Sequence, residues 1–230
     1  VIYRGKIIGK EQDFIDDAGI VIEEPEFINS LSGLENLKIL AEIQKKISEP
    51  EIIEVLKQFD LYEDRNKKVG KYSVGMKQKL RLAQAVMEKP QVLILDEPTA
   101  GLDPKERVRF RNLISAFSKD RIVILSTHIV SDVEFIAEEI IMMKSGQIIH
   151  FGNPQEITSE IDGQVWECTV PTAYAEKYAA AYNTSNLRNT SENQTILRII
   201  GDRPPMENAV RVQPTLEDLY LFYFKGGCEE

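Results

Sequence analysis

The sequence predicts an α/β fold: a parallel-sheet core with an inserted helical subdomain and a small α+β appendage at the end of the chain. Two continuous apolar runs, residues 92–95 (VLIL) and 122–125 (IVIL), are typical of central strands buried on both faces of a sheet. Between them, Asp103-Pro104 combines an N-cap residue with a proline at the first helical position. Strands joined by such a helix pair in parallel, because the crossover returns the chain to the same edge of the sheet.

The elements that precede the first of these runs are a strand and then helices. Residues 18–22 (AGIVI) are continuously apolar apart from one glycine and predict a buried strand. Ser48, with Glu51 three positions later, forms a capping box that opens a helix. A further helix is predicted over residues 76–89, so that the helical subdomain occupies about residues 26–90.

The elements that follow complete the core and form the appendage. Ser131 is predicted to cap another helix, and residues 140–151 form a hairpin around the turn Ser145-Gly146. Turn residues at Gly152-Asn153-Pro154 mark a boundary, which predicts one domain over residues 1–154 and the appendage over residues 155–230. The appendage is expected to contain a strand (165–170), a helix (172–182), a hairpin (187–200) and a last helix capped by Thr215 and Asp218.

The composition argues against two classes of protein. Among the 230 residues, 28 are basic and 37 are acidic, which gives a formal net charge of −9, and neither half of the chain is basic. A large nucleic-acid-binding face therefore has no support from the charge. No apolar run approaches the roughly 18–20 residues that a membrane-spanning helix needs.

The strongest chemical signal follows the apolar run VLIL, where the chain continues Asp96-Glu97-Pro98-Thr99. Open α/β sheets bind ligands at the carboxyl ends of their strands, which is where Asp96 would present its carboxylate to Mg²⁺. Glu97 can reach an attacking water as a general base or orienting group. The alternative for a lone Asp-Glu pair is a solvated acidic turn, and the continuation through Asp103 favours the functional interpretation.

The second signal is the segment Ser73-Val74-Gly75-Met76, at the start of a predicted helix. A serine N-cap leaves backbone N–H groups and the positive end of the helix dipole facing outwards, and Gly75 lets a ligand approach the backbone. This arrangement favours a phosphate group as the ligand. An ordinary serine cap is the alternative, and the position one helix upstream of Asp96 favours the functional interpretation.

Together these segments resemble the ATP-binding cassette (ABC) ATPases, whose core is a P-loop NTPase-like parallel sheet. Asp96-Glu97 is similar to the end of the family's Walker B motif, and Ser73-Val74-Gly75-Met76 is similar to its signature loop. Ala100-Gly101-Leu102-Asp103 is similar to its D-loop, and Ser126-Thr127-His128 to the segment with its switch histidine. The resemblance covers about residues 1–155.

The resemblance implies a subunit that binds ATP and Mg²⁺ and hydrolyses ATP to power an exporter. It implies that His128 contacts the γ-phosphate and holds the attacking water with Glu97, whereas the alternative for a histidine that ends a strand is a structural role. It implies a homo- or heterodimer of ATPase subunits, in which ATP lies between one copy's Walker motifs and the other copy's Ser73, Val74 and Gly75, with Asp103 close by. The implied partners are separate membrane permease subunits, which would hold the protein at the cytoplasmic face of the cell membrane.

One departure from the family concerns the phosphate loop. No G-x-x-x-x-G-K-[ST] sequence occurs in the 230 residues, so the phosphate-cradling backbone, its lysine and the Mg²⁺-binding hydroxyl are missing from this chain. We interpret the chain as lacking an N-terminal segment with that loop, and we expect the chain alone to be inactive as an ATPase. A domain that has truly lost the loop is the alternative.

A second departure is Glu23, which takes the position of the glutamine in the family's Q-loop. Its carboxylate can still ligate Mg²⁺ or position water. Glutamate here, followed by Glu24-Pro25, resembles the bacitracin and lantibiotic self-protection branch of the ABC ATPases. The alternative for Glu23 is a solvated loop residue.

Two rival functions stay open at this point. The first is an ABC-type protein that acts on DNA or ribosomes, although such proteins carry a long coiled coil or tandem cassettes and this chain has neither. The second is a non-catalytic regulatory module. The reading frame upstream of Val1 discriminates between them, because a strand followed by a phosphate loop there would exclude the regulatory module.

Overall fold

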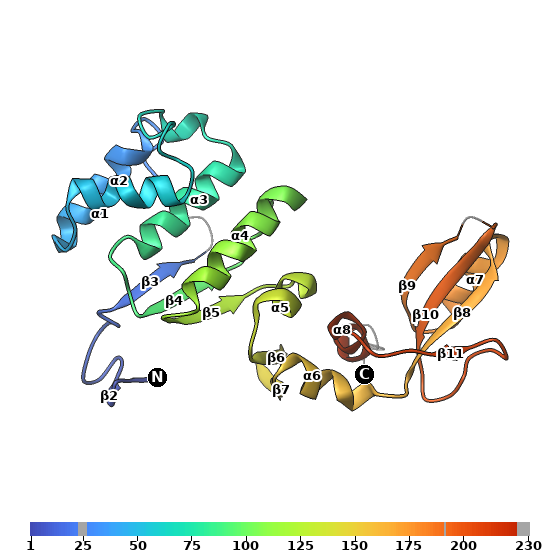
Figure 1. The fold of residues 1–230 in the computed structure, drawn as a ribbon. Coiled ribbons are helices and arrows are strands. Elements are labelled where there is room, and N and C mark those ends of the chain that lie inside the picture. The colour runs from blue at the N-terminus through green and yellow to red at the C-terminus, as the bar shows by residue number, and fades with distance from the viewer. Residues whose placement is uncertain (23–26, 191, 225–230) are drawn as a thin grey trace. The chain divides into compact units, whose positions relative to one another are not determined.

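A computed structural model describes residues 1–22, 27–190 and 192–224 of the chain (Figure 1). It divides into two compact units, residues 1–128 and residues 129–230, which are described separately. The division falls after His128, so the hairpin that follows belongs to the second unit. The domain boundary at residue 154 stays a prediction.

The sheet of the first unit is parallel, as the sequence predicts. Its strands are β3 (Ala18–Val21), β4 (Val92–Asp96) and β5 (Ile122–Ser126), and β4 lies in the middle. Helix α4 (Pro104–Phe117) provides the crossover between β4 and β5 (Figure 1). A short antiparallel hairpin, β1 (Ile2–Tyr3) and β2 (Lys6–Ile7), precedes the sheet.

The expectation of burial on both faces holds for the middle strand β4, where Val92 and Leu93 point to opposite faces and are 6% and 1% exposed, but it is wrong for β3 and β5. Side chains on one face, such as those of Leu93 and Leu95, are about 1% exposed. On the opposite face, Ile20, Ile122 and Ile124 are 44%, 63% and 55% exposed. The reason is that successive side chains of a strand point to opposite faces, and the helix that packs closely on β3 covers the face of Leu93.

The helical subdomain contains α1 (Gly33–Gln44), α2 (Glu49–Gln58), the 3-10 turn η1 (Val69–Lys71) and α3 (Val74–Val86). The predicted capping box is present at α2, where the Ser48 N–H and hydroxyl both donate to Glu51 at 2.9 Å. Helix α3 begins two residues earlier than predicted, because Ser73 caps it. The three helices enclose a core of fully buried side chains: Leu37, Ile52, Leu56, Phe59, Leu61 and Leu80.

A close backbone approach joins α3 to the sheet at Gly19 of β3. A Cβ atom at this position would lie 1.9 Å from the Ala85 carbonyl oxygen and 2.9 Å from Leu93 Cδ2. We therefore expect Gly19→Ala to force β3 and α3 apart and to lower the free energy of unfolding by about 1–3 kcal/mol, measured by urea denaturation. Gly201→Ala is the control, because the nearest atom to its Cβ would lie at 3.8 Å; equal stability of the two variants would contradict the expectation.

The second unit begins with α5 (Val130–Ile136) and the hairpin β6 (Ile140–Lys144) and β7 (Gln147–Gly152). The prediction that Ser131 caps this helix is wrong, because α5 already starts at Val130 and Ile129 occupies the N-cap position. The predicted turn is present, with Ser145 and Gly146 both in the left-handed region at φ 51° and 77°.

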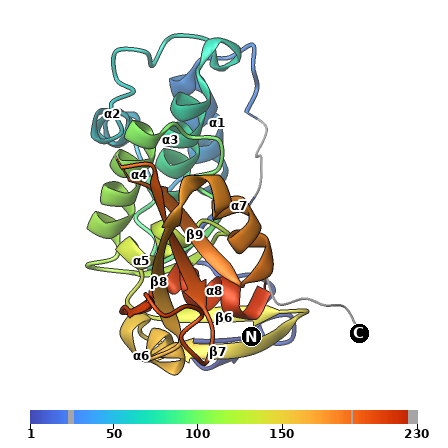
Figure 2. The same cartoon turned by 90° about the vertical axis from the view of Figure 1, so that its right-hand side faces the viewer.

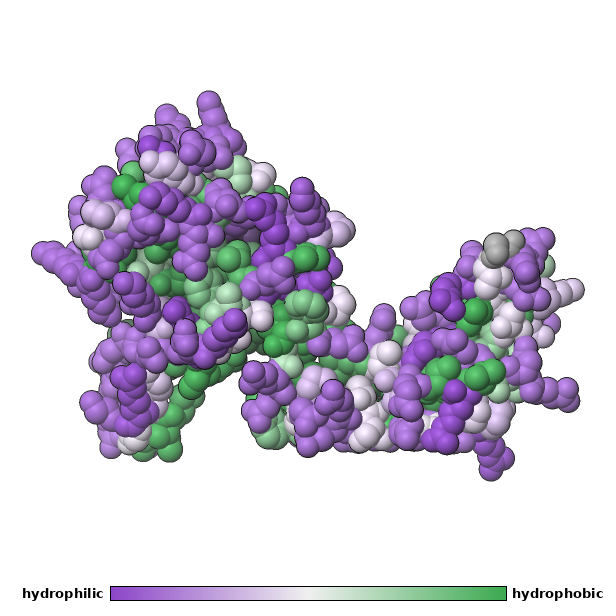
Figure 3. Space-filling view, viewed as in Figure 1, coloured by the Kyte–Doolittle hydropathy of each residue, from purple (hydrophilic) through white to green (hydrophobic). Residues whose placement is uncertain are grey.

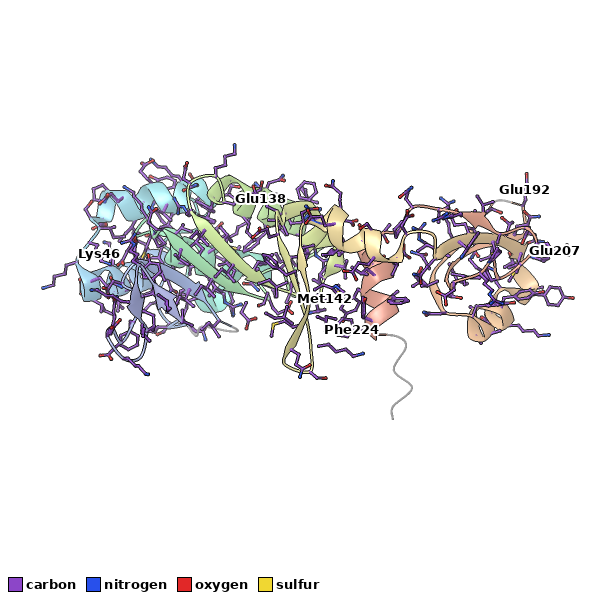
Figure 4. The ribbon with its side chains drawn as sticks, turned by 90° about the horizontal axis from the view of Figure 1, so that it is seen from below. Lys46, Glu138, Met142, Glu192, Glu207 and Phe224 are labelled. Atoms are coloured by element: carbon purple, nitrogen blue, oxygen red, sulfur yellow. The ribbon has the colours of Figure 1, made fainter. Side chains whose placement is uncertain are left out.

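The appendage forms an antiparallel sheet of four strands in the order β11 (Val210–Arg211), β8 (Val165–Pro171), β10 (Gln194–Ile200) and β9 (Thr184–Asn189). Helix α7 (Thr172–Ala181) packs on one face of this sheet (Figure 2). Helix α8 (Leu216–Phe224) packs instead on a core shared with the β6–β7 hairpin, where Met142 is buried and Phe224 lies against the cluster (Figure 4). The remaining elements are α6 (Pro154–Thr158) and η2 (Ser159–Ile161).

A buried ion pair fixes the start of α8 to the appendage sheet. Arg198 of β10 donates from Nη2 to Asp218 Oδ2 at 2.8 Å, and the Asp218 side chain is 2% exposed. Ser185 and Thr215 also donate to the Asp218 carboxylate, at 2.6 and 2.9 Å. Burial alone raises the pKa of Asp218, but the hydrogen bonds from Arg198, Ser185 and Thr215 outweigh it and hold that pKa below its usual value.

We expect Asp218→Asn to destabilise the second unit by about 3 kcal/mol at neutral pH, because it leaves the Arg198 charge buried with a weaker partner. Since the pKa of Asp218 is lower when folded, its stabilisation is complete above the unfolded value and is lost as the pH falls below about 4. Thermal unfolding at pH 7 and pH 3 measures both effects. Glu217→Gln, which changes the neighbouring exposed residue, is the control. An equal difference in stability between wild type and Asp218→Asn at pH 7 and at pH 3 would refute the role of the ionised Asp218 carboxylate.

The surface seen in Figure 3 is mostly hydrophilic, with apolar side chains gathered in patches between charged ones. Among the described residues, no helix is long and apolar enough to cross a membrane.

Candidate functional site

The carboxyl edge of the first sheet brings together the ends of β4 and β5. Asp96 is the last residue of β4, and it pairs in register with Ser126, the last residue of β5. The Ser126 hydroxyl donates to Asp96 Oδ1. This bond holds the carboxylate at the edge of the sheet.

Glu97 leaves the strand with its backbone in the left-handed region, at φ 45°, which is uncommon for a residue other than glycine. Its N–H donates to the Ser126 carbonyl at 3.0 Å, so the register of the sheet extends by one bond beyond Asp96. Backbone conformations of this kind persist where the surrounding structure holds them and are frequent at functional sites. The turn directs the Glu97 side chain towards the residues that follow β5.

The Glu97 carboxylate contacts both residues that follow Ser126. The Thr127 hydroxyl donates to Oε2 at 3.1 Å, and the His128 N–H donates to Oε1 at 3.1 Å. The His128 ring places Nδ1 2.7 Å from the same Oε1. The structure therefore brings Asp96, Glu97 and His128 together at one edge of the sheet, where the family resemblance pairs Glu97 with His128.

This cluster is open to solvent: the His128 side chain is 71% exposed and that of Glu97 is 35% exposed. An ionised carboxylate only accepts hydrogen bonds, so the hydrogen in the short contact belongs to Nδ1. The Nε2 atom of His128 is then the ring nitrogen that is left for a ligand or a water. A polar triad with this exposure is suited to act on a substrate that arrives from solvent.

The Ser73–Gly75 segment lies elsewhere on the same unit, at the start of α3. The Ser73 hydroxyl accepts from the Met76 N–H at 3.2 Å, and Ser73 and Val74 are both exposed. The segment lies against the turn that precedes α4 and against α4 itself: a Cβ on Gly101 would lie 3.6 Å from Val74, and one on Gly75 would lie 3.5 Å from Glu106.

Asp103 begins α4 and has a local structural partner. Its Oδ1 accepts from the Glu106 N–H at 2.9 Å, which is the predicted N-cap bond. In the preceding turn, the Ala100 N–H donates to the Glu97 carbonyl at 3.1 Å, and Gly101 has a left-handed backbone at φ 72°. The predicted contact of Asp103 with nucleotide stays a prediction.

The sequence analysis assigned no separate role to two residues that bond to the carboxylates of the site. Ser126 and Thr127 precede the histidine, and they orient Asp96 and Glu97 through their hydroxyl groups. The sequence does contain a signal for this contact: a hydroxyl residue at the end of β5 lies opposite the end of β4 once the two strands pair in register. Glu23, by contrast, lies outside the described residues, so its predicted roles stay predictions.

The donor set is compatible with Mg²⁺. This ion prefers hard oxygen ligands and usually keeps several waters together with substrate phosphates, so one or two carboxylates suffice. Asp96 offers one oxygen at the sheet edge. Within the described ranges, no three His, Cys, Asp or Glu side chains cluster as a complete metal cage.

A parallel sheet that ends in Asp96-Glu97 and Ser126-Thr127-His128 is typical of nucleotide-binding α/β proteins. The family model described as ABC transporter matches residues 3–100. An uncharacterized ABC transporter ATP-binding protein of Bacillus subtilis, YybJ, is 33% identical over 64% of this chain and 68% of its own length. The chain belongs to the ABC transporter family of ATP-binding proteins, which confirms the resemblance seen in the sequence.

The relatives include proteins of the predicted branch. The bacitracin transport ATP-binding protein BcrA of Enterococcus faecalis is 37% identical over 60% of this chain and 46% of its own length. The lantibiotic transport ATP-binding protein SrtF of Streptococcus pyogenes is 37% identical over 57% of each chain. The chain spans about half the length of the first curated relatives that it matches.

A solved structure supports the fold class. The ADP conformation of MJ1267, an ATP-binding cassette of an ABC transporter, matches with a TM-score of 0.52 and 23% identity, over 60% of this chain and 62% of the other. The predicted P-loop NTPase-like sheet is therefore confirmed as a fold.

Proposed function

We propose that the intact protein containing this chain hydrolyses ATP and powers transport through separate membrane subunits. The observation that carries the proposal is the Glu97 carboxylate, which lies beside Asp96 at the carboxyl edge of the sheet and bonds to both the backbone and the ring of His128. A carboxylate and a histidine that are joined in this way and are open to solvent are suited to orient a water molecule for attack on a phosphoryl group.

In this proposal each residue has one task. Glu97 accepts a hydrogen from the attacking water, and the Thr127 and His128 bonds fix its orientation. His128 Nε2 faces the γ-phosphate or the same water, because Nδ1 is engaged by Glu97. Asp96 and Glu23 would hold Mg²⁺, which when bound neutralises charge on the phosphates. The phosphate loop that the 230 residues lack would come from another segment of the intact protein.

The position of Ser73–Gly75 supports a dimeric site. The segment is exposed at the N-terminus of α3, where backbone N–H groups and the helix dipole favour a phosphate. Because the segment is exposed and is similar to the family's signature loop, we propose that Ser73, Val74 and Gly75, with Asp103 close by, contact the nucleotide held by a second ATPase subunit. That subunit is either a second copy or a related chain.

The partners in transport would be permease subunits, which would hold the protein at the cytoplasmic face of the cell membrane. The helical subdomain, residues 26–90, and the loop of Glu23 would form the coupling surface. The similarity to the bacitracin transport protein BcrA and the lantibiotic transport protein SrtF favours a peptide antibiotic as the transported compound, and we propose export as the direction.

ATP hydrolysis by the intact protein, with and without its permease in proteoliposomes, tests this proposal. We expect hydrolysis that the permease and a peptide antibiotic such as bacitracin stimulate. Stimulation by DNA or ribosomes instead would support the first rival function. ATP binding without any hydrolysis would support a regulatory module and would overturn the proposal.

A further inference from the structure

Two side chains in the second turn of α3 reach the segment that links Glu97 to α4. Gln78 is 6% exposed, and its Nε2 donates to the Ala100 carbonyl at 3.4 Å. Lys79 Nζ lies 3.0 Å from Glu106 Oε2, in the first turn of α4. The helix that begins with Ser73 therefore contacts both ends of the 100–106 segment.

The ion pair between Lys79 and Glu106 differs from a solvated surface pair. Its side chains are 12% and 24% exposed, whereas those of the i,i+3 pair Lys57–Glu54 are 49% and 70% exposed. Partial burial reduces screening by water and salt, so such a pair holds two elements together better than an exposed pair does. Arg109 also approaches Glu106, at 3.6 Å, but its side chain is 48% exposed.

The first turn of α3 adds contacts on the same side. Val74 is the nearest neighbour of the Gly101 Cβ position, and Glu106 is the nearest neighbour of the Gly75 position. The Ala100 N–H donates to the Glu97 carbonyl at 3.1 Å, so the turn that α3 contacts is hydrogen-bonded to the backbone of Glu97. A displacement of Ser73–Gly75 would therefore reach Glu97 through a short series of direct contacts.

We infer that Gln78 and Lys79 are positioning residues that fix the 100–106 segment to the Ser73 helix, so that contact of Ser73–Gly75 with one nucleotide sets the position of Glu97 at the other. The inference rests on the proposed function. In the proposed dimer, Ser73–Gly75 contacts the nucleotide of the second subunit, while Glu97 acts on the nucleotide of its own. The contacts of Gln78 and Lys79 would then couple the two ATP sites.

A charge exchange in the intact protein tests the inference. We expect Lys79→Glu and Glu106→Lys each to lower kcat about tenfold and to reduce the Hill coefficient for ATP, with the dissociation constant of a fluorescent ATP analogue unchanged. The double variant should recover to within about threefold of the wild-type kcat, because the pair is restored with opposite polarity. Arg109→Gln is the control and should change kcat less than about twofold, since it removes an exposed neighbour of Glu106 and an exposed ion pair with Asp60 but leaves the Lys79–Glu106 pair in place.

A second variant keeps the test decisive if the charge reversals fail to fold. Gln78→Met keeps the length of the side chain but removes the bond to Ala100, and we expect it to lower kcat and the Hill coefficient without changing the melting temperature by more than about 3 °C. Wild-type kcat and Hill coefficient in the folded single variants would overturn the inference and leave the proposed function standing. A double variant that is folded but as slow as the slower single variant would overturn it too. Absence of hydrolysis by the wild-type protein would overturn both.

Discussion

Replacing Glu97 by glutamine should lower kcat for ATP hydrolysis by the intact protein about a thousandfold while ATP binding is retained. Glutamine has nearly the same shape, so its carbonyl oxygen can still accept from the His128 N–H, as Oε1 of Glu97 does. An amide does not accept a proton from water, so the step that Glu97 is proposed to assist is lost. ATP that is bound but not hydrolysed should hold two subunits together.

Phosphate release, ATP binding and light scattering measure the three parts of this prediction. The control is Glu54→Gln, which changes a side chain that is 70% exposed on the surface of α2. Near wild-type kcat for Glu97→Gln would show that Glu97 is not the base. Loss of ATP binding together with kcat would assign it to nucleotide binding instead.

Replacing His128 by alanine should lower kcat about a hundredfold, with a smaller effect on ATP binding. The substitution removes the ring that lies 2.7 Å from Glu97 Oε1, while the backbone N–H bond to the same oxygen survives. Glu97 then keeps its place but loses the imidazole that is proposed to face the γ-phosphate or the water. Because the side chain is largely exposed, the variant should fold normally.

The second histidine of the chain offers a matched control. His150 lies on β7 in the second unit, where its Nδ1 contacts Glu160 at 2.8 Å and its ring lies against Tyr223. His150→Ala should reduce stability by packing loss and leave kcat within about twofold of wild type. A greater loss of kcat in His150→Ala than in His128→Ala would contradict the roles assigned to the two residues.

The sequence predicts the order and type of the elements around the site because local signals determine them. Ser73 and Asp103 are caps that work through bonds to residues three positions later, and both bonds are present. The strands that end at Asp96 and Ser126 are continuous apolar runs, which single them out as sheet elements. The pairing of His128 with Glu97 came from the resemblance to the ABC ATPases, and the structure has both residues at the edge where the parallel strands end.

Other features depend on tertiary structure and were beyond prediction. The left-handed backbone of Glu97 has no local signal, since glycine would be the expected residue there. The exposure of Ile122 and Ile124 depends on which face of the sheet is covered, and an apolar run is the same in either case. The contact of α3 with Gly19 requires the packed arrangement of two distant segments.

The hydrogen bond of Asp103 confirms one of the two roles that its position in the sequence suggests. From the sequence, Asp103 is predicted to cap α4 and to contact nucleotide, and the structure shows the cap. The cap bond uses one of the acceptor positions of its carboxylate, and others are left for a ligand. A role that depends on a second subunit is not encoded in the contacts of one chain.

The position of the γ-phosphate tests the central claim most directly. It can be measured in a structure of the intact Glu97→Gln protein with MgATP. We predict a γ-phosphate beside His128 and the residue 97 side chain, with Asp96 on the Mg²⁺ side and Ser73–Gly75 of a second subunit closing the site. A nucleotide bound away from the edge formed by Asp96 and His128, or one contacted by Ser73 of the same subunit, would contradict it.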